Sequence, residues 1–151
     1  MCDWTDYFLP SVSGFEEGWA LYAEFLGNEL GLFSDPRDLL GYYSFNLLRA
    51  SRLVVDTGVH YMGWSRKRMV DFIYENTSLS RKFSEIQADR YITWPGQATS
   101  YKLGELKFHE LRAAQEKKKK ADFDLKKFHT SLLSCIGALD SVEDCINAKK
   151  E

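Results

Sequence analysis

Residues 15–32 read FEEGWALYAEFLGNELGL, and this stretch sets the fold class of the chain. Its apolar side chains recur at three- and four-residue steps, which is the spacing of one face of an α-helix. These side chains are Trp19, Tyr22, Ala23, Leu26 and Leu30. We therefore predict an amphipathic helix over residues 16–32, and Gly31 is its expected end.

The same helical spacing continues along the rest of the chain, so we predict an all-α fold, a multi-helix array. Asp35 and Pro36 supply an N-cap and a first-turn proline for a long helix that ends near His60. Asp122 is the expected cap before the last pair of helices. The helices after the long one are expected over residues 65–74, 80–91, 98–119, 125–134 and 141–148, with Ser65 and Ser80 as caps.

Length and composition indicate one globular domain. The chain has 151 residues, 44% of them hydrophobic, and a net charge of −2. This charge argues against nucleic acid or an anionic membrane as the main partner. No apolar run approaches the roughly 20 residues that a membrane-spanning helix needs. Residues 1–6 lack the basic and apolar regions of a signal peptide, so the expected location by default is the cytoplasm.

The three cysteines give no sign of a metal or disulfide framework. Cys2, Cys135 and Cys145 are odd in number and widely spaced, and no Cys-x-x-Cys occurs. We therefore predict free thiols in a reducing compartment.

Glu17 lies at the start of the first predicted helix, just before Gly18 and Trp19. Some helical metallopeptidases present their third zinc ligand in this way, together with a pair of histidines from another helix. The three histidines of the chain, at positions 60, 109 and 129, are far apart in sequence. The sequence therefore indicates one half of a metal site. The alternative is a helix N-terminal glutamate that the helix dipole favours.

Four segments resemble a known family in their order and spacing. They are residues 15–24, residues 49–60 with 63–65, residues 90–98 with 100–106, and residues 123–125 with 128–129. With these segments the chain resembles the C-terminal part of the domain-of-unknown-function family 885. These are helical proteins related in pattern to zinc carboxypeptidases of the Taq type. The resemblance implies that residues 15–151 are the C-terminal part of a metallopeptidase-like domain, preceded by an N-terminal extension over residues 1–14.

The resemblance also implies roles for individual residues. Glu17 is the third zinc ligand, and His60 and Tyr101 are catalytic groups that stabilise a developing oxyanion. The weaker candidates are Arg52 and Gln97 for substrate contacts, and Glu24, seven residues after Glu17, for orienting a metal ligand. Structural roles remain open as alternatives: a buried-core role for Tyr101, a satisfied helix-end role for His60 and a plain carboxylate role for Glu24.

The segment that carries the other two zinc ligands and the general base in this family, His-Glu-x-x-Pro-Gly-His, is absent. His109 and Glu110 begin like it, but no second histidine follows. We therefore expect zinc in the full-length family and none bound by this chain alone. The expected partners are a missing N-terminal half and, in the full-length form, a peptide substrate. The hypotheses are an inactive C-terminal fragment of a zinc peptidase and a non-catalytic binding or scaffold remnant.

Two geometric expectations follow from the fragment hypothesis. Glu17, His60 and Tyr101 should converge on one concave surface, within about 10 Å of each other, because zinc bonds and hydrogen bonds to one reacting carbonyl are short. An apolar wall should also be exposed where the missing half was removed. The candidates for this wall are Trp19, Tyr22, Trp64, Trp94 and Tyr101.

Overall fold

A computed structural model describes residues 12–149, and this part of the chain contains seven α-helices and no strand, which confirms the all-α prediction. None of the described helices is both long and apolar enough to cross a membrane. The helices are α1 Ser13–Glu29, α2 Pro36–His60, α3 Arg66–Asn76, α4 Arg81–Thr93, α5 Gln97–Lys119, α6 Leu125–Leu133 and α7 Leu139–Ala148, with a 3-10 turn over Lys120–Asp122.

Local capping explains where most of these helices begin. Asp35 accepts a hydrogen bond from the backbone N–H of Arg37, and Asp38 accepts one from the backbone N–H of Asp35, which forms a capping box. Ser65 and Ser80 cap α3 and α4 through their hydroxyl oxygens. These caps confirm the sequence-based boundaries, because a cap needs only residues within one turn of each other.

Three helix starts and one helix cap differ from the prediction. Helix α5 begins one residue earlier than expected, at Gln97, and α7 begins two residues earlier, at Leu139. The first helix begins at Ser13, three residues earlier than expected. The cap of α6 is Asp124 rather than Asp122, since Asp122 belongs to the 3-10 turn that follows α5. Asp124 accepts hydrogen bonds from the backbone N–H groups of Lys126 and Lys127.

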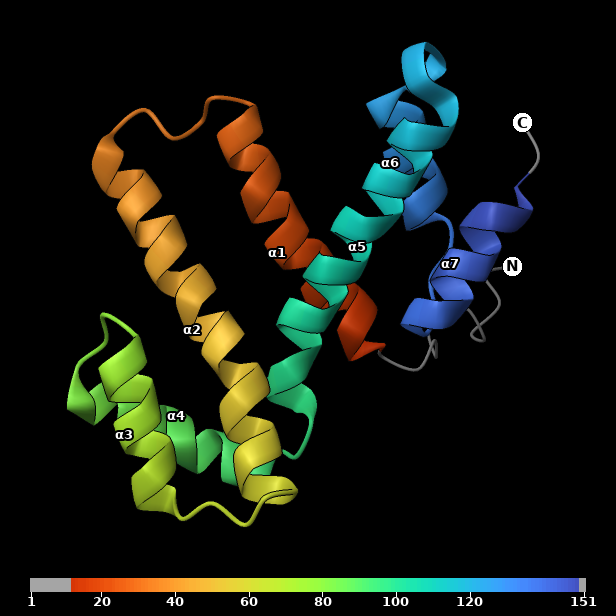
Figure 1. The fold of residues 1–151 in the computed structure, drawn as a ribbon. Helices are drawn as coiled ribbons and strands as arrows, with labels where there is room; N and C mark the ends of the chain where they lie inside the picture. The colour runs from red at the N-terminus through yellow and green to blue at the C-terminus, as the bar shows by residue number, and fades with distance from the viewer. Residues whose placement is uncertain (1–11, 150–151) are drawn as a thin grey trace, which may run out of the picture.

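The helices are arranged around the pair α1 and α5, which lie side by side (Figure 1). Helix α2 joins α1 through residues 30–35 and carries the α3–α4 hairpin at its far end, whereas α6 and α7 lie at the opposite end of α5. Each end has its own core. The first core includes Phe15, Tyr22, Phe108, Phe128, Leu132 and Val142, and the second includes Leu48, Val55, Met69, Ile73, Ala88 and Tyr91.

Two glycines allow α1 and α5 to approach within backbone contact. A Cβ atom on Gly104 would lie 2.0 Å from the carbonyl oxygen of Gly14 and 2.6 Å from the Cα atom of Gly18. A Cβ atom on Gly18 would lie 2.5 Å from the Cα atom of Gly104. Neither position can hold a larger residue unless the helices move apart.

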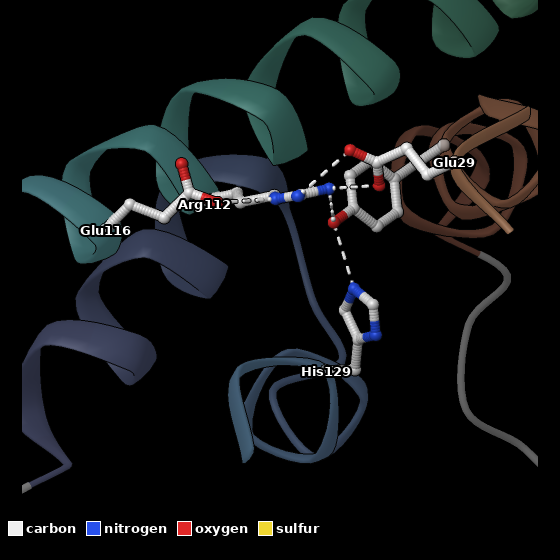
Figure 2. A network of polar contacts seen from close by, with 5 residues as sticks. Glu29, Arg112, Glu116 and His129 are labelled. Atoms are coloured by element: carbon white, nitrogen blue, oxygen red, sulfur yellow. Dashed lines mark hydrogen bonds and ion pairs between the residues drawn. The ribbon is translucent and has the colours of Figure 1, made fainter. Parts of the chain in front are cut away.

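A partly buried polar network holds α6 against this helix pair (Figure 2). The hydroxyl of Tyr22, which is fully buried, lies 2.9 Å from Nε2 of His129 and accepts a hydrogen bond of 3.4 Å from Arg112. Arg112 donates two further hydrogen bonds to Glu29, of 2.7 and 3.1 Å, and one of 2.9 Å to Glu116. The network therefore ties together α1, α5 and α6.

The environment of this network lowers the pKa of two histidines. Burial lowers the pKa of His129, and the nearby positive charge of Arg112 acts in the same direction. Burial also lowers the pKa of His109, whose ring packs edge-on against the rings of Tyr22 and Phe25. Both pKa shifts favour the neutral form of the imidazole ring.

The prediction of free thiols is wrong for two of the three cysteines. Cys135 and Cys145 form a disulfide that joins the segment after α6 to α7. The turn between these helices reverses the chain, so the two Cα atoms come within 5.8 Å despite a separation of ten residues. Cys2 lies outside the described residues.

The predicted exposed aromatic wall is also wrong as a group. Tyr22 is completely buried in the first core, while Trp19, Trp64 and Tyr101 are only partly exposed. Trp94 alone is well exposed, at 59%. The sequence pattern marked these residues as apolar but could not show which of them the other helices cover. The exposed apolar side chains of α2 are Leu40, Tyr43, Phe45, Leu47 and Val54.

The close crossing of α1 and α5 predicts that alanine lowers the free energy of unfolding at the two crossing glycines and raises it at an exposed glycine of α2. Gly104→Ala and Gly18→Ala should each lower the free energy of unfolding by about 1–3 kcal/mol, because the added methyl group meets backbone atoms. Gly41→Ala is the control, since Gly41 is exposed inside α2 and its Cβ would meet nothing within 4 Å. It should raise stability by roughly 0.5–1 kcal/mol. Urea unfolding measures all three, and a Gly104→Ala protein as stable as Gly41→Ala would contradict the crossing.

The two partly buried histidines predict that the free energy of unfolding falls as the pH falls from about 7.5 to 5.5. The pKa of each is lower in the folded chain than in the unfolded chain, so the unfolded chain binds more protons in this range. Stability is therefore lost once the pH drops below the unfolded value of about 6.5. The profile of unfolding free energy against pH should become flatter in the His109→Gln/His129→Gln double variant. A wild-type profile that is flat or rises toward pH 5.5 would show that these rings are not desolvated.

Candidate functional site

The residues assigned to a site from the sequence come from three helices. Glu17 lies in the second turn of α1, Arg52 and His60 lie in the second half of α2, and Gln97 and Tyr101 lie in the first two turns of α5. Helix α4 packs against α2 and adds a fourth element to the group. Residues far apart in sequence thus come together: Glu17 and Gln97 are in contact although 80 positions separate them.

A short loop sets the position of the α5 residues. Gly96 precedes α5 with a φ of 78°, a left-handed conformation that favours glycine. Its backbone N–H lies 3.1 and 3.2 Å from the two carboxylate oxygens of Asp56, which is only 5% exposed. Asp56 therefore fixes the loop, and with it Gln97 and Tyr101, to α2. Sequence reasoning missed this role; the available signal was a charged residue four positions after Arg52, within an apolar helix.

A line of polar contacts runs from Glu17 to Tyr101. Gln97 donates from Nε2 to Oε1 of Glu17 over 3.4 Å, and its own Oε1 accepts a 3.0 Å hydrogen bond from Arg90. The same Arg90 nitrogen lies 3.5 Å from the hydroxyl of Tyr101. Arg90, which comes from α4, was given no role from the sequence although it lies in one of the segments that carry the family resemblance. Arg90 contacts Gln97 and Tyr101 directly and is linked to Glu17 through Gln97. The sequence had assigned a role to each of these residues.

Arg52 is the most buried cation of this region, at 6% exposure. Its Nε donates a 2.9 Å hydrogen bond to the hydroxyl of Tyr91, and its guanidinium carbon lies 4.6 Å from the ring centroid of Tyr101. Burial raises the pKa of the Tyr91 phenol, and the charge of Arg52 opposes this shift. Arg52 and Tyr101, which the sequence assigned to the same site, are therefore in direct contact.

His60 does not contact this line of residues directly. Its Nε2 lies 2.9 Å from the backbone carbonyl oxygen of Tyr91, so it ties the end of α2 to α4. The described residues show no hydrogen bond from His60 to Glu17 or to Tyr101. This contact fits the structural alternative for His60, and a catalytic role stays a prediction.

Glu24 forms an ion pair with an arginine of α2, and its role in orienting a metal ligand stays a prediction. Its carboxylate lies 3.3 Å from Nη2 of Arg49. Both residues line a pocket of about 330 Å³ between α1 and α2. The rest of its lining comes from Phe33, Asp38, Gly41, Tyr42 and Phe45.

The described residues do not bring the ligands of a complete metal site together. No group of three His, Cys, Asp or Glu side chains with the right arrangement occurs within residues 12–149. A catalytic zinc ion needs three protein ligands, and Glu17 offers one carboxylate, half-buried and held by Gln97. The role of Glu17 as a metal ligand therefore stays a prediction.

The described residues thus form an all-helical fold in which a polar cluster joins α1, α4 and α5. The chain belongs to the family described as bacterial protein of unknown function (DUF885), which it matches over residues 6–139. No curated protein matches it.

Two solved structures are similar to the chain. The first is a protein from Colwellia psychrerythraea, described as a "putative lipoprotein", with a TM-score of 0.88 and 37% identity over 92% of this chain and 24% of its own. The second is a protein from Shewanella oneidensis, described as a "putative lipoprotein of unknown function", with a TM-score of 0.81 and 27% identity over 89% of this chain and 25% of its own. The chain thus spans about a quarter of the length of these proteins.

We predict that the 151-residue chain by itself binds zinc weakly. One carboxylate cannot supply the geometry that a tight zinc site requires. Calorimetric titration with zinc measures this directly. A stoichiometric site of nanomolar affinity that is lost in Glu17→Ala would show that the chain holds a complete ligand set.

Proposed function

We propose that this chain is the C-terminal part of a zinc-dependent, peptidase-like domain in which Glu17 is one metal ligand. The observation that carries the proposal is the continuous contact from Glu17 through Gln97 and Arg90 to Tyr101. It aligns a carboxylate, a cation and a phenol along one wall. A hydrolytic zinc site needs these groups: a ligand for the metal and donors for the oxyanion.

The residues of the chain have separate tasks in this proposal. Gln97 orients the carboxylate of Glu17, as outer partners of metal ligands do. Arg90 donates toward the oxygen of Tyr101, which leaves the phenolic proton free for an oxygen of the substrate. Arg52 adds positive charge against the Tyr101 ring. A bound zinc ion supplies the activation of water and the polarisation of the carbonyl group.

The length of the relatives supports a domain completed by further chain. The solved relatives are about four times as long as the segment they share with this chain, so they have room for the remaining ligands and the general base. In the proposal that remainder is the partner of this chain, and a peptide is the substrate of the whole.

A non-catalytic binding protein is the second candidate function. It is favoured by the exposed apolar side chains of α2, which are unusual for a helix surrounded by water. The same surface is expected if the rest of a larger domain packs on α2. Metal binding by the completed domain therefore separates the two candidates.

The disulfide bears on where the protein acts. Disulfides form and persist in oxidising compartments and are rare in the cytosol. The bond between Cys135 and Cys145 therefore supports a location outside the reducing cytoplasm, in place of the default taken from residues 1–6.

The proposal is tested in a chimera in which a relative of known structure supplies the rest of the domain. Residues 6–139 of this chain replace the matching quarter of the Colwellia psychrerythraea protein, and the zinc content of the chimera is measured by elemental mass spectrometry. We expect one zinc per chain and its loss in Glu17→Gln, which keeps the shape of the side chain but removes its charge. Glu16→Gln is the matched control, because Glu16 is the exposed neighbour on the same helix.

Two results contradict the proposal. One is a folded chimera that contains no zinc while the parent Colwellia psychrerythraea protein does. The other is zinc content that is unchanged by Glu17→Gln. Absence of zinc from both the parent and the chimera would favour the non-catalytic candidate.

A further inference from the structure

Two neighbouring arginines of α2 carry buried N–H groups that have no partner among the described residues. These groups are Nε and Nη1 of Arg49 and Nη1 of Arg52. Arg52 is 6% exposed, and the side chain of Arg49 is 17% exposed. A buried donor on a charged group is costly when it stays unsatisfied, and native structures rarely keep one without a reason.

The charges around these arginines do not balance. Arg49 has one carboxylate partner, Glu24, at 3.3 Å. In the part of the chain that the structure describes, Arg52 contacts only the neutral groups of Tyr91, Gln87 and Tyr101. Arg90 likewise has no ion pair within residues 12–149; it contacts Gln97, Tyr101 and the ring of Trp94.

The charges of Arg49, Arg52 and Arg90 all influence the hydroxyl of Tyr91. Burial raises the pKa of the Tyr91 phenol, and Arg52, Arg90 and Arg49 all oppose that shift through their charge. The hydroxyl of Tyr91 therefore lies within the electrostatic influence of three arginines. An anion placed near it would be attracted by all three arginines. The carboxylates of Glu17, Glu24 and Asp56 lie in the same region, and each already accepts a hydrogen bond.

A largely apolar pocket lies beside Arg49. Arg49 lines the pocket of about 330 Å³ between α1 and α2, and aromatic side chains form much of the remaining wall. The lining residues Tyr42, Phe45 and Arg49 follow one another at steps of three and four along α2. Arg52 comes three residues later, so it lies on the same face of α2 one turn further on.

We propose that Arg49 and Arg52 form a carboxylate-binding subsite and that the adjoining pocket holds an apolar or aromatic group attached to that carboxylate. A guanidinium group presents paired donors that match the two oxygens of a carboxylate. The carboxylate can come from a ligand or from an Asp or Glu side chain in the remainder of the domain. As a substrate subsite it rests on the proposed peptidase function, whereas carboxylate binding itself requires no metal.

The first experiment uses the 151-residue chain with a metal chelator present. Calorimetric titration compares N-acetylphenylalanine with its C-terminal amide, which has the same ring but no negative charge. We expect the acid to bind at least about tenfold more tightly than the amide, since hydrogen bonds between charged groups are the strong ones. Inorganic phosphate is a third ligand and should bind more weakly than the acid because it cannot fill the apolar pocket.

Variants assign the binding to the two arginines. Arg49→Gln and Arg52→Met should each weaken binding of the acid by about tenfold or more. Arg81→Gln is the control, because Arg81 is exposed and pairs with Asp71 away from the pocket. Arg52→Met should also keep or raise the melting temperature, since it replaces a buried cation that lacks a carboxylate partner. This combination of lost binding and retained stability distinguishes a binding residue from a structural one. If Arg52→Met does not fold, the affinity of Arg49→Gln for the acid decides whether the arginines form the subsite.

Three results overturn the proposal: equal binding of the acid and the amide, phosphate binding as tight as that of the acid, or unchanged binding in both arginine variants. The chimera described above identifies the source of the carboxylate. Binding of the acid to both the chain and the chimera supports a ligand subsite. Binding to the chain alone supports a carboxylate from the rest of the domain and rejects the substrate role. Zinc content is measured separately, so a chimera without zinc would contradict the peptidase proposal and leave carboxylate binding standing.

Discussion

The rest of the structure depends on the close crossing of α1 and α5 at Gly18 and Gly104. A Cβ atom at either position would meet backbone atoms of the other helix at 2.5 Å or less. Because Glu17 adjoins Gly18, and Gln97 lies two turns before Gly104, this crossing sets the 3.4 Å contact between their side chains. A side chain at the crossing would separate the helices and with them the beginning of the polar line to Tyr101.

The arginines at the two ends of this helix pair differ in how completely their donors are hydrogen-bonded. At one end Arg112 is satisfied by Glu29, Glu116 and the hydroxyl of Tyr22, and the disulfide holds the adjoining α7. Such a network stabilises and specifies a packing arrangement. At the other end Arg49 and Arg52 keep unsatisfied donors. Natural proteins violate local rules of this kind mainly at functional sites, which supports the proposal of a binding site at the second end, whereas the first end is a structural clamp.

The sequence was most informative where a structure depends on neighbouring residues. Asp35, Ser65 and Ser80 cap their helices as predicted, since a cap involves only the next two or three residues. The cap at Asp124 was misplaced by two positions because the choice between two aspartates depends on how α5 ends. For the site, residue types at family positions indicated Glu17, Gln97, Arg52 and Tyr101, and the structure brings these into one connected region.

The sequence by itself therefore determined the helices, their order and the residue types available for chemistry, because apolar spacing and capping are local properties. Only the tertiary structure decided which groups meet. Asp56 reaches Gly96 across 40 positions, and Cys135 reaches Cys145 because a turn reverses the chain. Tyr22 is buried because α5 and α6 cover it, and Arg52 lacks an anionic partner because no described carboxylate packs against it. Each of these facts depends on contacts between distant helices, which no local pattern records.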